Sequence, residues 1–321
     1  MSDFISGIAP DIRAMLDYRE ALGYKRATHE ARLVSLDRFC AANYPDADIL
    51  SQEIVMNWLG EQCSGIGEKA SSARLLGRYM KALGKDAYVL YQSYMKKKSR
   101  KEAYLFTDDE LSALFKAIDA IAVTNKEPFL PEIAPVLYRL IYTCGLRPNE
   151  GRGLKRSQVN LKTGEILITE TKWKKERVVV MSEDMLALCR TYEKRRDIIA
   201  RGNEYFFPSW KSGRSFGSYQ LDNYFKSAWK RANPKVDKDI LPNVRVYDLR
   251  HRFASAVLVR WLDSNQPLGA KLTYLRAYMG HSSLSETAYY IHLLPESLVR
   301  SAGIDWAAFD EMAPEVIPWE S

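Results

Sequence analysis

The sequence predicts a mainly α-helical protein of two domains, the second of which also holds a small antiparallel β-sheet. Three observations support this class. Apolar residues recur at helical spacing from Pro10 to Gly84, with almost no strand signal. One later stretch has the pattern of a β-hairpin, and a run of charge between the two parts marks a linker. A chain of 321 residues is long enough for each part to bury a core.

The first domain, at 1–95, is expected to be a small bundle of four helices. Apolar side chains form one stripe along each helical segment, and Gly23 is a stop signal for the first. The four expected ranges are about 12–22, 27–43, 52–62 and 69–83. The pattern alone is that of a generic helical domain.

A basic linker is expected at 96–103, because the run from Lys96 to Lys101 has no apolar period. Thr107-Asp108-Asp109-Glu110 has the form of a capping box and begins a helix, so the second domain is placed at 104–321. Residues 101–302 hold 32 Lys and Arg against 23 Asp and Glu. The positive charge of the chain is thus concentrated where its motifs lie, which is compatible with a polyanionic partner.

Two apolar helices, at about 111–121 and 133–142, open the second domain. They lead into Cys144-Gly145-Leu146-Arg147-Pro148, where Pro148 suits the first position of a helix and puts Arg147 at its N-terminal edge. A hairpin is expected from its β-rich flanks at 164–172 and 177–181. The rest is expected to be helical, apart from loops near 202–218 and 233–243.

Composition excludes several classes of function. The net charge is +7, no apolar run is long enough to span a bilayer, and the first residues lack the basic flank of a signal peptide, so a cytoplasmic protein is expected. Four cysteines without CxxC spacing indicate neither zinc nor disulfides. The four histidines form no metal-binding motif and no Walker-type loop is present, so neither a metal nor any other cofactor is expected.

Four short motifs carry the chemistry. They are Gly145-Leu146-Arg147 followed by Glu150, Tyr247-Asp248-Leu249-Arg250, Gly280-His281, and Tyr290 two places before His292. Together they resemble the active site of the tyrosine recombinase (phage integrase) family, in its simple two-domain form found in mobile elements and Xer-like enzymes. Nearly the whole chain takes part in the resemblance, although the specific motifs are confined to about 140–292.

The resemblance implies a fold and an activity. A SAM-like core-binding domain at 1–95 and a catalytic domain at 104–321 would close as a C-shaped clamp on double-stranded DNA. The enzyme would be a site-specific recombinase or integrase, of a kind that transposons also encode, that cuts and rejoins strands through a 3′-phosphotyrosine intermediate. It would act as a homo-tetramer on synapsed DNA and be a monomer or weak oligomer when free, with an accessory recombinase or directionality protein as an optional partner.

Residue roles follow from the same resemblance. The tyrosine is the nucleophile that stores the phosphodiester bond energy, two arginines bind the phosphate, a hairpin lysine protonates the leaving oxygen, and Glu150 supports them. The implied catalytic residues are Arg147, Lys172, Tyr247, Arg250, His281 and Tyr290. The implied DNA-binding residues are Arg26, Arg32, Lys96, Lys97, Lys98, Lys174 and Lys175.

Several alternatives stay open at this point. Tyr289 competes with Tyr290 as nucleophile, and Lys174 and Lys175 compete with Lys172 as acid. The family's usual histidine in H-x-x-R is here Tyr247, while His251 is expected to face elsewhere on its helix. The rival functions are a type IB topoisomerase-like relaxation enzyme and a catalytically silent DNA-binding protein. The tail after residue 292 packs on its own domain or docks in a neighbouring protomer.

Overall fold

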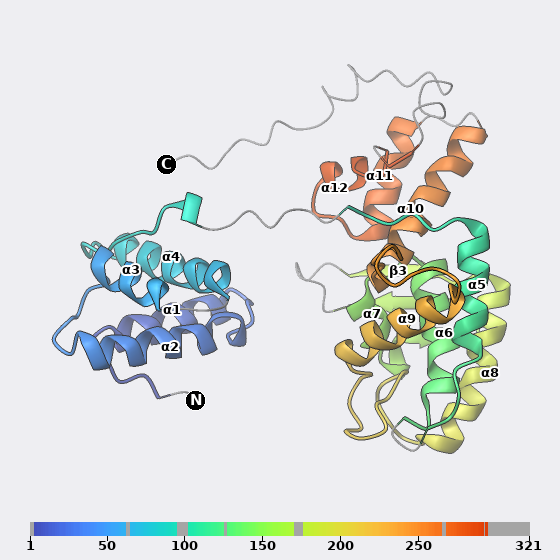
Figure 1. Ribbon diagram of the computed structural model, residues 1–321, viewed down its shortest axis with the longest axis horizontal. Helices are drawn as coiled ribbons and strands as arrows, with labels where there is room; N and C mark the ends of the chain where they lie inside the picture. Colours follow the sequence, from blue (N-terminus) through green and yellow to red (C-terminus); the bar gives the residue numbers. More distant parts are fainter. Residues whose placement is uncertain are drawn as a thin grey trace. The chain divides into compact units, whose positions relative to one another are not determined.

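The computed structural model describes residues 3–61, 65–94, 102–124, 127–169, 176–264, 268–291 and 293–294. The chain divides into two compact units, Met1–Lys101 and Glu102–Ser321 (Figure 1). The expected fold class, mainly helical with one small antiparallel sheet, is confirmed. No helix within the described ranges is long and apolar enough to cross a membrane.

The first unit is built from four helices. They are α1 (Ala9–Ala21), α2 (Ala27–Asn43), α3 (Gln52–Gly60) and α4 (Ile66–Ala82), followed by the short 3₁₀ helix η1 (Gln92–Tyr94). Ser51 begins α3, because its hydroxyl accepts a hydrogen bond from the backbone nitrogen of Ile54 at 3.2 Å. Trp58 is fully buried among Leu36 and Leu76, so helices α2, α3 and α4 share one core. Each helix begins and ends within three residues of its expected position.

Helix α6 (Leu130–Thr143) lies at the centre of the second unit. It packs against α5 (Asp108–Asp119), α8 (Glu183–Ile199) and α10 (Val246–Asp263), and α5 in turn packs on α9 (Ser218–Ala232) (Figure 1). The capping box that begins α5 is present in both directions. The Thr107 hydroxyl accepts from the nitrogen of Glu110, and the Glu110 carboxylate accepts from the nitrogen of Thr107.

The sheet has three antiparallel strands in the order β1 (Val159–Asn160), β2 (Glu165–Ile168), β3 (Arg177–Val180). Strands β2 and β3 are the expected hairpin. Ile166 lies opposite Val179, and both are buried, so one face of the sheet covers the core while alternate residues face outwards. Strand β1 was not predicted from the sequence, because two residues are too few to produce an alternating pattern.

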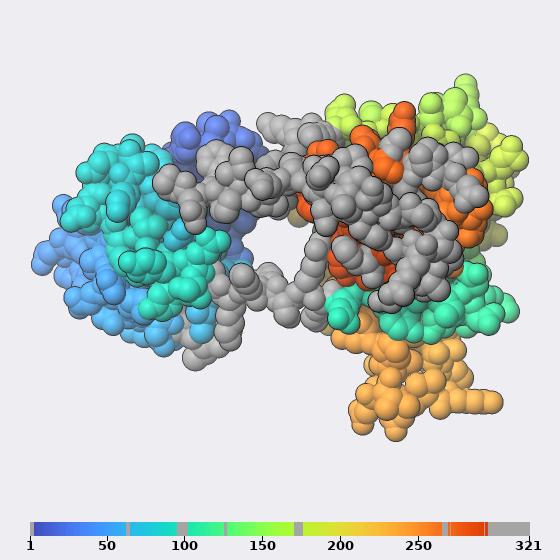
Figure 2. Space-filling view, turned by 90° about the horizontal axis from the view of Figure 1, so that it is seen from above, coloured from blue at the N-terminus to red at the C-terminus, as the bar shows by residue number. Residues whose placement is uncertain are grey.

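Short elements complete the second unit: α7 (Pro148–Arg152), the 3₁₀ helix η2 (Arg156–Gln158), α11 (Leu268–Met279) and α12 (Leu284–Ala288). Helix α10 packs on α11, and α11 packs on α12 and on β3. The loop from α9 to α10 is exposed over residues 234–240, and Figure 2 shows this orange part of the chain as a projection of the unit. The turns before α7 and before α12 bring the motif residues together.

Candidate active site

The turn between α6 and α7 positions Arg147. Gly145 has φ 60°, and a Cβ at this position would lie 2.4 Å from the ring of Phe253, so only glycine fits the turn. Arg147 then stands directly before α7, with Pro148 as the first helical residue. Its side chain is 30% exposed, and its two terminal nitrogens donate to Glu150 Oε1 at 2.8 Å and to the carbonyl of Gly280 at 2.6 Å.

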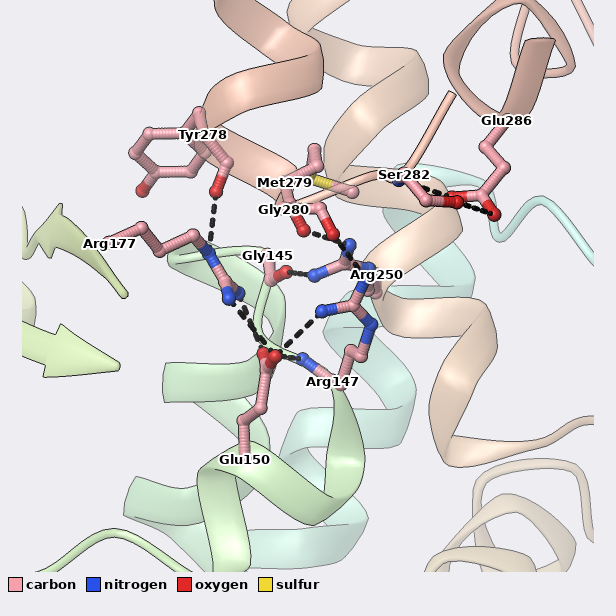
Figure 3. Close-up of polar contacts among 10 residues, drawn as sticks. All are labelled: Gly145, Arg147, Glu150, Arg177, Arg250, Tyr278, Met279, Gly280, Ser282 and Glu286. Atoms are coloured by element: carbon pink, nitrogen blue, oxygen red, sulfur yellow. Dashed lines mark hydrogen bonds and ion pairs between the residues drawn. The ribbon is translucent and has the colours of Figure 1, made fainter. Parts of the chain in front are cut away.

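Glu150 is the centre of a buried charge network (Figure 3). It accepts hydrogen bonds from the backbone and side chain of Arg147 and from both terminal nitrogens of Arg177, at 2.7 to 3.0 Å. Burial alone would raise the pKa of the Glu150 carboxyl, but the hydrogen bonds and charges of Arg177 and Arg147 lower it to about 2. Glu150 is therefore ionised at neutral pH, and it fixes Arg147 in place.

Arg177 is a site residue that sequence reasoning missed. It begins β3, its side chain is 8% exposed, and its Nε donates to the carbonyl of Tyr278 at 2.8 Å while its terminal nitrogens bind Glu150. It thereby joins the sheet, α7 and the end of α11. The signal in the sequence was weak: an arginine at the head of an otherwise apolar strand, Arg177-Val178-Val179-Val180.

Arg250 lies on α10, whose first turn is capped by the Asp248 carboxylate accepting from the nitrogen of Arg245 at 2.7 Å. The Arg250 guanidinium is fully buried and donates to the carbonyls of Gly145 and Met279, each at 2.5 Å (Figure 3). Burial lowers the pKa of Arg250. Among the described residues its Nε has no hydrogen-bond partner. Arg250 thus shares the site with Arg147, but only Arg147 is open to solvent.

The turn between α11 and α12 carries His281. Its Nδ1 pairs with the hydroxyl of Thr287 at 2.8 Å, and both side chains are buried. Burial, together with the charges of Arg250 and Arg147, lowers the pKa of His281 to about 3, so its imidazole is neutral in this structure. Its ring stacks on that of Tyr290 with centroids 5.8 Å apart and planes 18° apart.

Tyr290 lies in the same site, although it comes from the far end of the described chain. It is 2% exposed, and burial raises the pKa of its hydroxyl to about 12, against the opposing charges of Arg250 and Arg147. Tyr289 is placed differently, since its hydroxyl accepts a hydrogen bond from the nitrogen of Ala103 at 3.3 Å. The structure therefore stacks Tyr290 on His281 within reach of the charges of both arginines, whereas the Tyr289 hydroxyl is bonded to Ala103.

Tyr247 and His251 occupy one side of α10. Tyr247 is half-buried. Burial lowers the pKa of Arg147, but interactions with Glu150 and, to a smaller extent, with Tyr247 raise it above its ordinary value. The expectation that His251 faces elsewhere is wrong: its ring lies 4.9 Å from that of Tyr247 and 5.5 Å from that of Tyr290. Residues four apart on a helix share a face, so His251 follows Tyr247 into the site.

Other expected site residues lie elsewhere. Lys96, Lys97, Lys98, Lys172, Lys174, Lys175 and His292 lie outside the described residues. Arg26, in the first unit, pairs with Asp17, Glu20 and Glu30, and Arg32 donates to the carbonyl of Thr28 at 2.5 Å. The part of the chain that the structure describes contains no group of three His, Cys, Asp or Glu side chains able to hold a metal.

Gly280 gives a testable measure of how tightly the site is built. Its φ is 64°, and an added Cβ would meet Arg177 Nη1 at 3.0 Å. Gly280→Ala is expected to lower the free energy of unfolding by about 1–2 kcal/mol through the left-handed backbone alone, and further by displacing Arg177. Gly84→Ala is the matched control, since Gly84 has φ 82° and open space around it. Equal losses in urea unfolding of the two variants would contradict the contact with Arg177.

The site holds two guanidiniums and a neutral imidazole near a tyrosine, on a mainly helical unit with a small sheet. This set of groups suits phosphoryl transfer with a tyrosine nucleophile. The sequence profile of the phage integrase family matches residues 104–297. The chain belongs to the phage integrase family. The predictions of a tyrosine recombinase and of site-specific DNA recombination are thereby confirmed, and neither topoisomerase-like relaxation nor a silent DNA-binding protein is favoured.

Individual proteins resemble the chain over most of its length. A protein of Sinorhizobium fredii described as an integrase/recombinase, y4rB, is 25% identical over 295 residues, covering 89% of this chain and 92% of that protein. The tyrosine recombinase XerD of Rhizobium meliloti is 26% identical over 287 residues, covering 86% of this chain and 85% of XerD.

Solved structures have the same fold. The XerH recombinase bound to a palindromic difH substrate, in a post-cleavage complex, gives a TM-score of 0.58 at 19% identity and covers 88% of this chain and 80% of XerH. The Tn1549 transposon integrase in complex with circular intermediate DNA gives 0.60 at 16% identity, covering 94% of this chain and 99% of that one.

Proposed function

We propose that the chain cuts one strand of double-stranded DNA with Tyr290, holds the 3′ phosphate on that residue, and rejoins it to a new 5′ end. The observation that carries this proposal is the meeting of Arg147, Arg250, His281 and Tyr290 in one site, although they come from separate segments of the second unit. A covalent phosphotyrosine keeps the energy of the phosphodiester bond, so rejoining needs no nucleotide.

The arginines supply the electrostatic part of the mechanism. Negative charge grows on the non-bridging oxygens as the phosphate is attacked, and a guanidinium remains charged throughout. Arg147, whose side chain is partly exposed and held by Glu150, is placed to bind first. Arg250 bonds two carbonyls through Nη1 and Nη2, and its Nε has no partner among the described residues, so it keeps N–H donors for the phosphate.

The acid that protonates the departing 5′ oxygen is proposed to be Lys172, which lies between β2 and β3 in the sequence. Lys172→Ala is expected to slow cleavage about 10²-fold or more, the usual contribution of a general acid. A 5′-bridging phosphorothiolate at the cut site should restore the rate, because a thiolate leaves without a proton. Lys174→Ala and Lys175→Ala are the matched controls, and a larger defect in either one would move the assignment to that residue.

DNA binding beyond the cut site is proposed to involve both units and the segment between them. The basic run Lys96, Lys97 and Lys98 would follow backbone phosphates, as would Lys174, Lys175 and Arg32. Arg26 is a weaker candidate than the sequence indicated, since three acidic side chains surround it. Recombination exchanges strands between two duplexes, so we expect four protomers on the synapsed DNA, with the optional accessory proteins named above.

Trapping the covalent intermediate tests the proposed function. The DNA site is unknown, so the probe is a random-sequence duplex library with a nick near each candidate site, which lets the cut fragment diffuse away. Protein-linked DNA that survives denaturing electrophoresis is expected from the wild type, and sequencing it yields the preferred duplex. The absence of any linked DNA from a folded, DNA-binding preparation would overturn the proposal.

A further inference from the structure

One face of α10 points three side chains into the site. Tyr247, Arg250 and His251 stand at positions i, i+3 and i+4, which lie together on a helix. The His251 ring is half-buried and lies 5.5 Å from the ring of Tyr290, 4.9 Å from that of Tyr247 and 6.0 Å from that of Tyr289. An imidazole is thus surrounded by three phenols, one of which is the proposed nucleophile.

The reaction needs a group that takes the proton of Tyr290. Burial raises the pKa of this hydroxyl to about 12, so the phenolate does not form on its own near neutral pH. Tyr247 is a poor acceptor, because a neutral phenol would first have to lose its own proton before it could take another. His281 is also unsuited, since its Nδ1 is engaged by Thr287, and burial with the charges of three arginines lowers its pKa to about 3.

We propose, resting on the function proposed above, that His251 is the general base that accepts the proton of Tyr290 during strand cleavage and returns it during rejoining. It would do the work for which Tyr247 is chemically unsuited, from one helical turn further along the same face. The group that its ring contacts is the reacting phenol itself, which makes it a catalytic residue.

The proposed step balances as follows. The O–H bond of Tyr290 breaks and its proton passes to a ring nitrogen of His251. The phenolic oxygen forms a bond to the scissile phosphorus, and the bond from phosphorus to the 5′ oxygen breaks. That oxygen takes a proton from the general acid. On rejoining, a 5′ hydroxyl gives its proton back to the deprotonated general acid, and its oxygen bonds to phosphorus. The bond from phosphorus to Tyr290 breaks, and the leaving phenolate recovers its proton from the His251 imidazolium.

The geometry permits this transfer. A phenol oxygen and an imidazole nitrogen both extend beyond their ring centroids, so rings 5.5 Å apart lie within reach of a hydrogen bond of about 2.7–2.8 Å after side-chain rotation. Catalytic hydrogen bonds of free enzymes commonly tighten only when substrate binds. Among the described residues, the titratable groups whose rings lie within 6.0 Å of that of His251 include Tyr247, Tyr289 and Tyr290, and the charge of His251 also acts on His281.

His251→Gln tests the assignment, with the preferred duplex from the trapping assay as probe. The rate of covalent attachment is expected to fall about 10²-fold, the usual contribution of a general base. On the 5′-phosphorothiolate duplex the defect should persist, because the better leaving group does not replace a proton acceptor. This separates His251 from Lys172, whose loss the same duplex restores. Tyr247→His in the His251→Gln background should recover at least a tenfold gain, by placing an imidazole one turn away on the same face.

Each outcome bears on His251 separately from the proposed function, because wild-type attachment is measured alongside. An unchanged rate in His251→Gln, or a defect that disappears with the phosphorothiolate, overturns the assignment, as does a failure of Tyr247→His to improve the double variant. Thermal unfolding and DNA binding by gel shift check that each variant is folded. If His251→Gln does not fold, His251→Asn with added imidazole replaces it, and a rate that imidazole leaves unchanged counts against the base.

Discussion

Tyr290→Phe is expected to abolish covalent attachment to DNA while leaving DNA binding intact. The substitution removes only the hydroxyl, and the phenyl ring keeps its stacking on His281 and its place among the buried residues of the second unit. In the proposed mechanism this hydroxyl oxygen forms the bond to phosphorus, so the linked product should fall below detection. The measurement is denaturing electrophoresis of the nicked duplex after incubation, with gel shift to confirm binding.

Tyr289→Phe is the matched control for this prediction. It removes the same atom from the neighbouring residue, whose hydroxyl is bonded to the backbone of Ala103. Attachment should continue in this variant, with a small loss of stability of about 1 kcal/mol for one hydrogen bond. If Tyr289→Phe lost attachment and Tyr290→Phe retained it, the nucleophile would be Tyr289, and the site would have to rearrange before cleavage.

Glu150→Gln is expected to destabilise the second unit by about 3–5 kcal/mol, the usual effect of removing one member of a buried ion pair. The amide cannot neutralise Arg177, whose guanidinium is 8% exposed, and it releases Arg147 as well. Cleavage should slow because Arg147 is no longer held in place. Urea unfolding measures the loss of stability, and the attachment assay measures the slower cleavage. Glu132→Gln is the control, since its partner Arg195 is exposed and such a pair contributes about 0–1 kcal/mol.

The effect of Glu150→Gln should also depend on pH. The pKa of Glu150 is lowered in the folded protein, from 4.5 to about 2, so its charge stabilises the fold fully above pH 4.5. This stabilisation is lost as the pH falls through the interval towards 2. The difference in stability between wild type and Glu150→Gln should therefore be constant near neutral pH and shrink below pH 4.5. A difference that grows on acidification would contradict the ion-pair account.

The helices and the hairpin could be predicted because their signals are local. Apolar spacing set the ranges of α1 to α6, and the Thr107–Glu110 pair marked the start of α5. The motif residues Arg147, Arg250, His281 and Tyr290 were also identified, by resemblance, and the structure brings them into one site. How far each is exposed was not predictable, since the full burial of Arg250 depends on carbonyls far away in the chain.

Arg177 and His251 were missed for different physical reasons. The role of Arg177 comes from contacts with Glu150 and the carbonyl of Tyr278, which only the tertiary fold creates. The direction of the His251 side chain was inferred from its neighbour Arg250, which lies about 100° away around the helix. Tyr247, one turn earlier, is the better guide, because residues four apart share a face. Arg250 and His251 both reach the site, because the site surrounds the whole face of α10 on which they lie.

The burial of Tyr290 has a consequence for how the protein behaves in a cell full of DNA. With 2% of its surface exposed, the residue is shielded from any duplex that merely collides with the protein. In the proposed mechanism a phosphate must meet its hydroxyl, so the side chains that cover Tyr290 would have to shift, and the contacts of a properly seated duplex would compensate the cost of that shift. With Tyr290 as the proposed nucleophile, packing would limit breakage of the genome at random sites before sequence recognition adds its own selection.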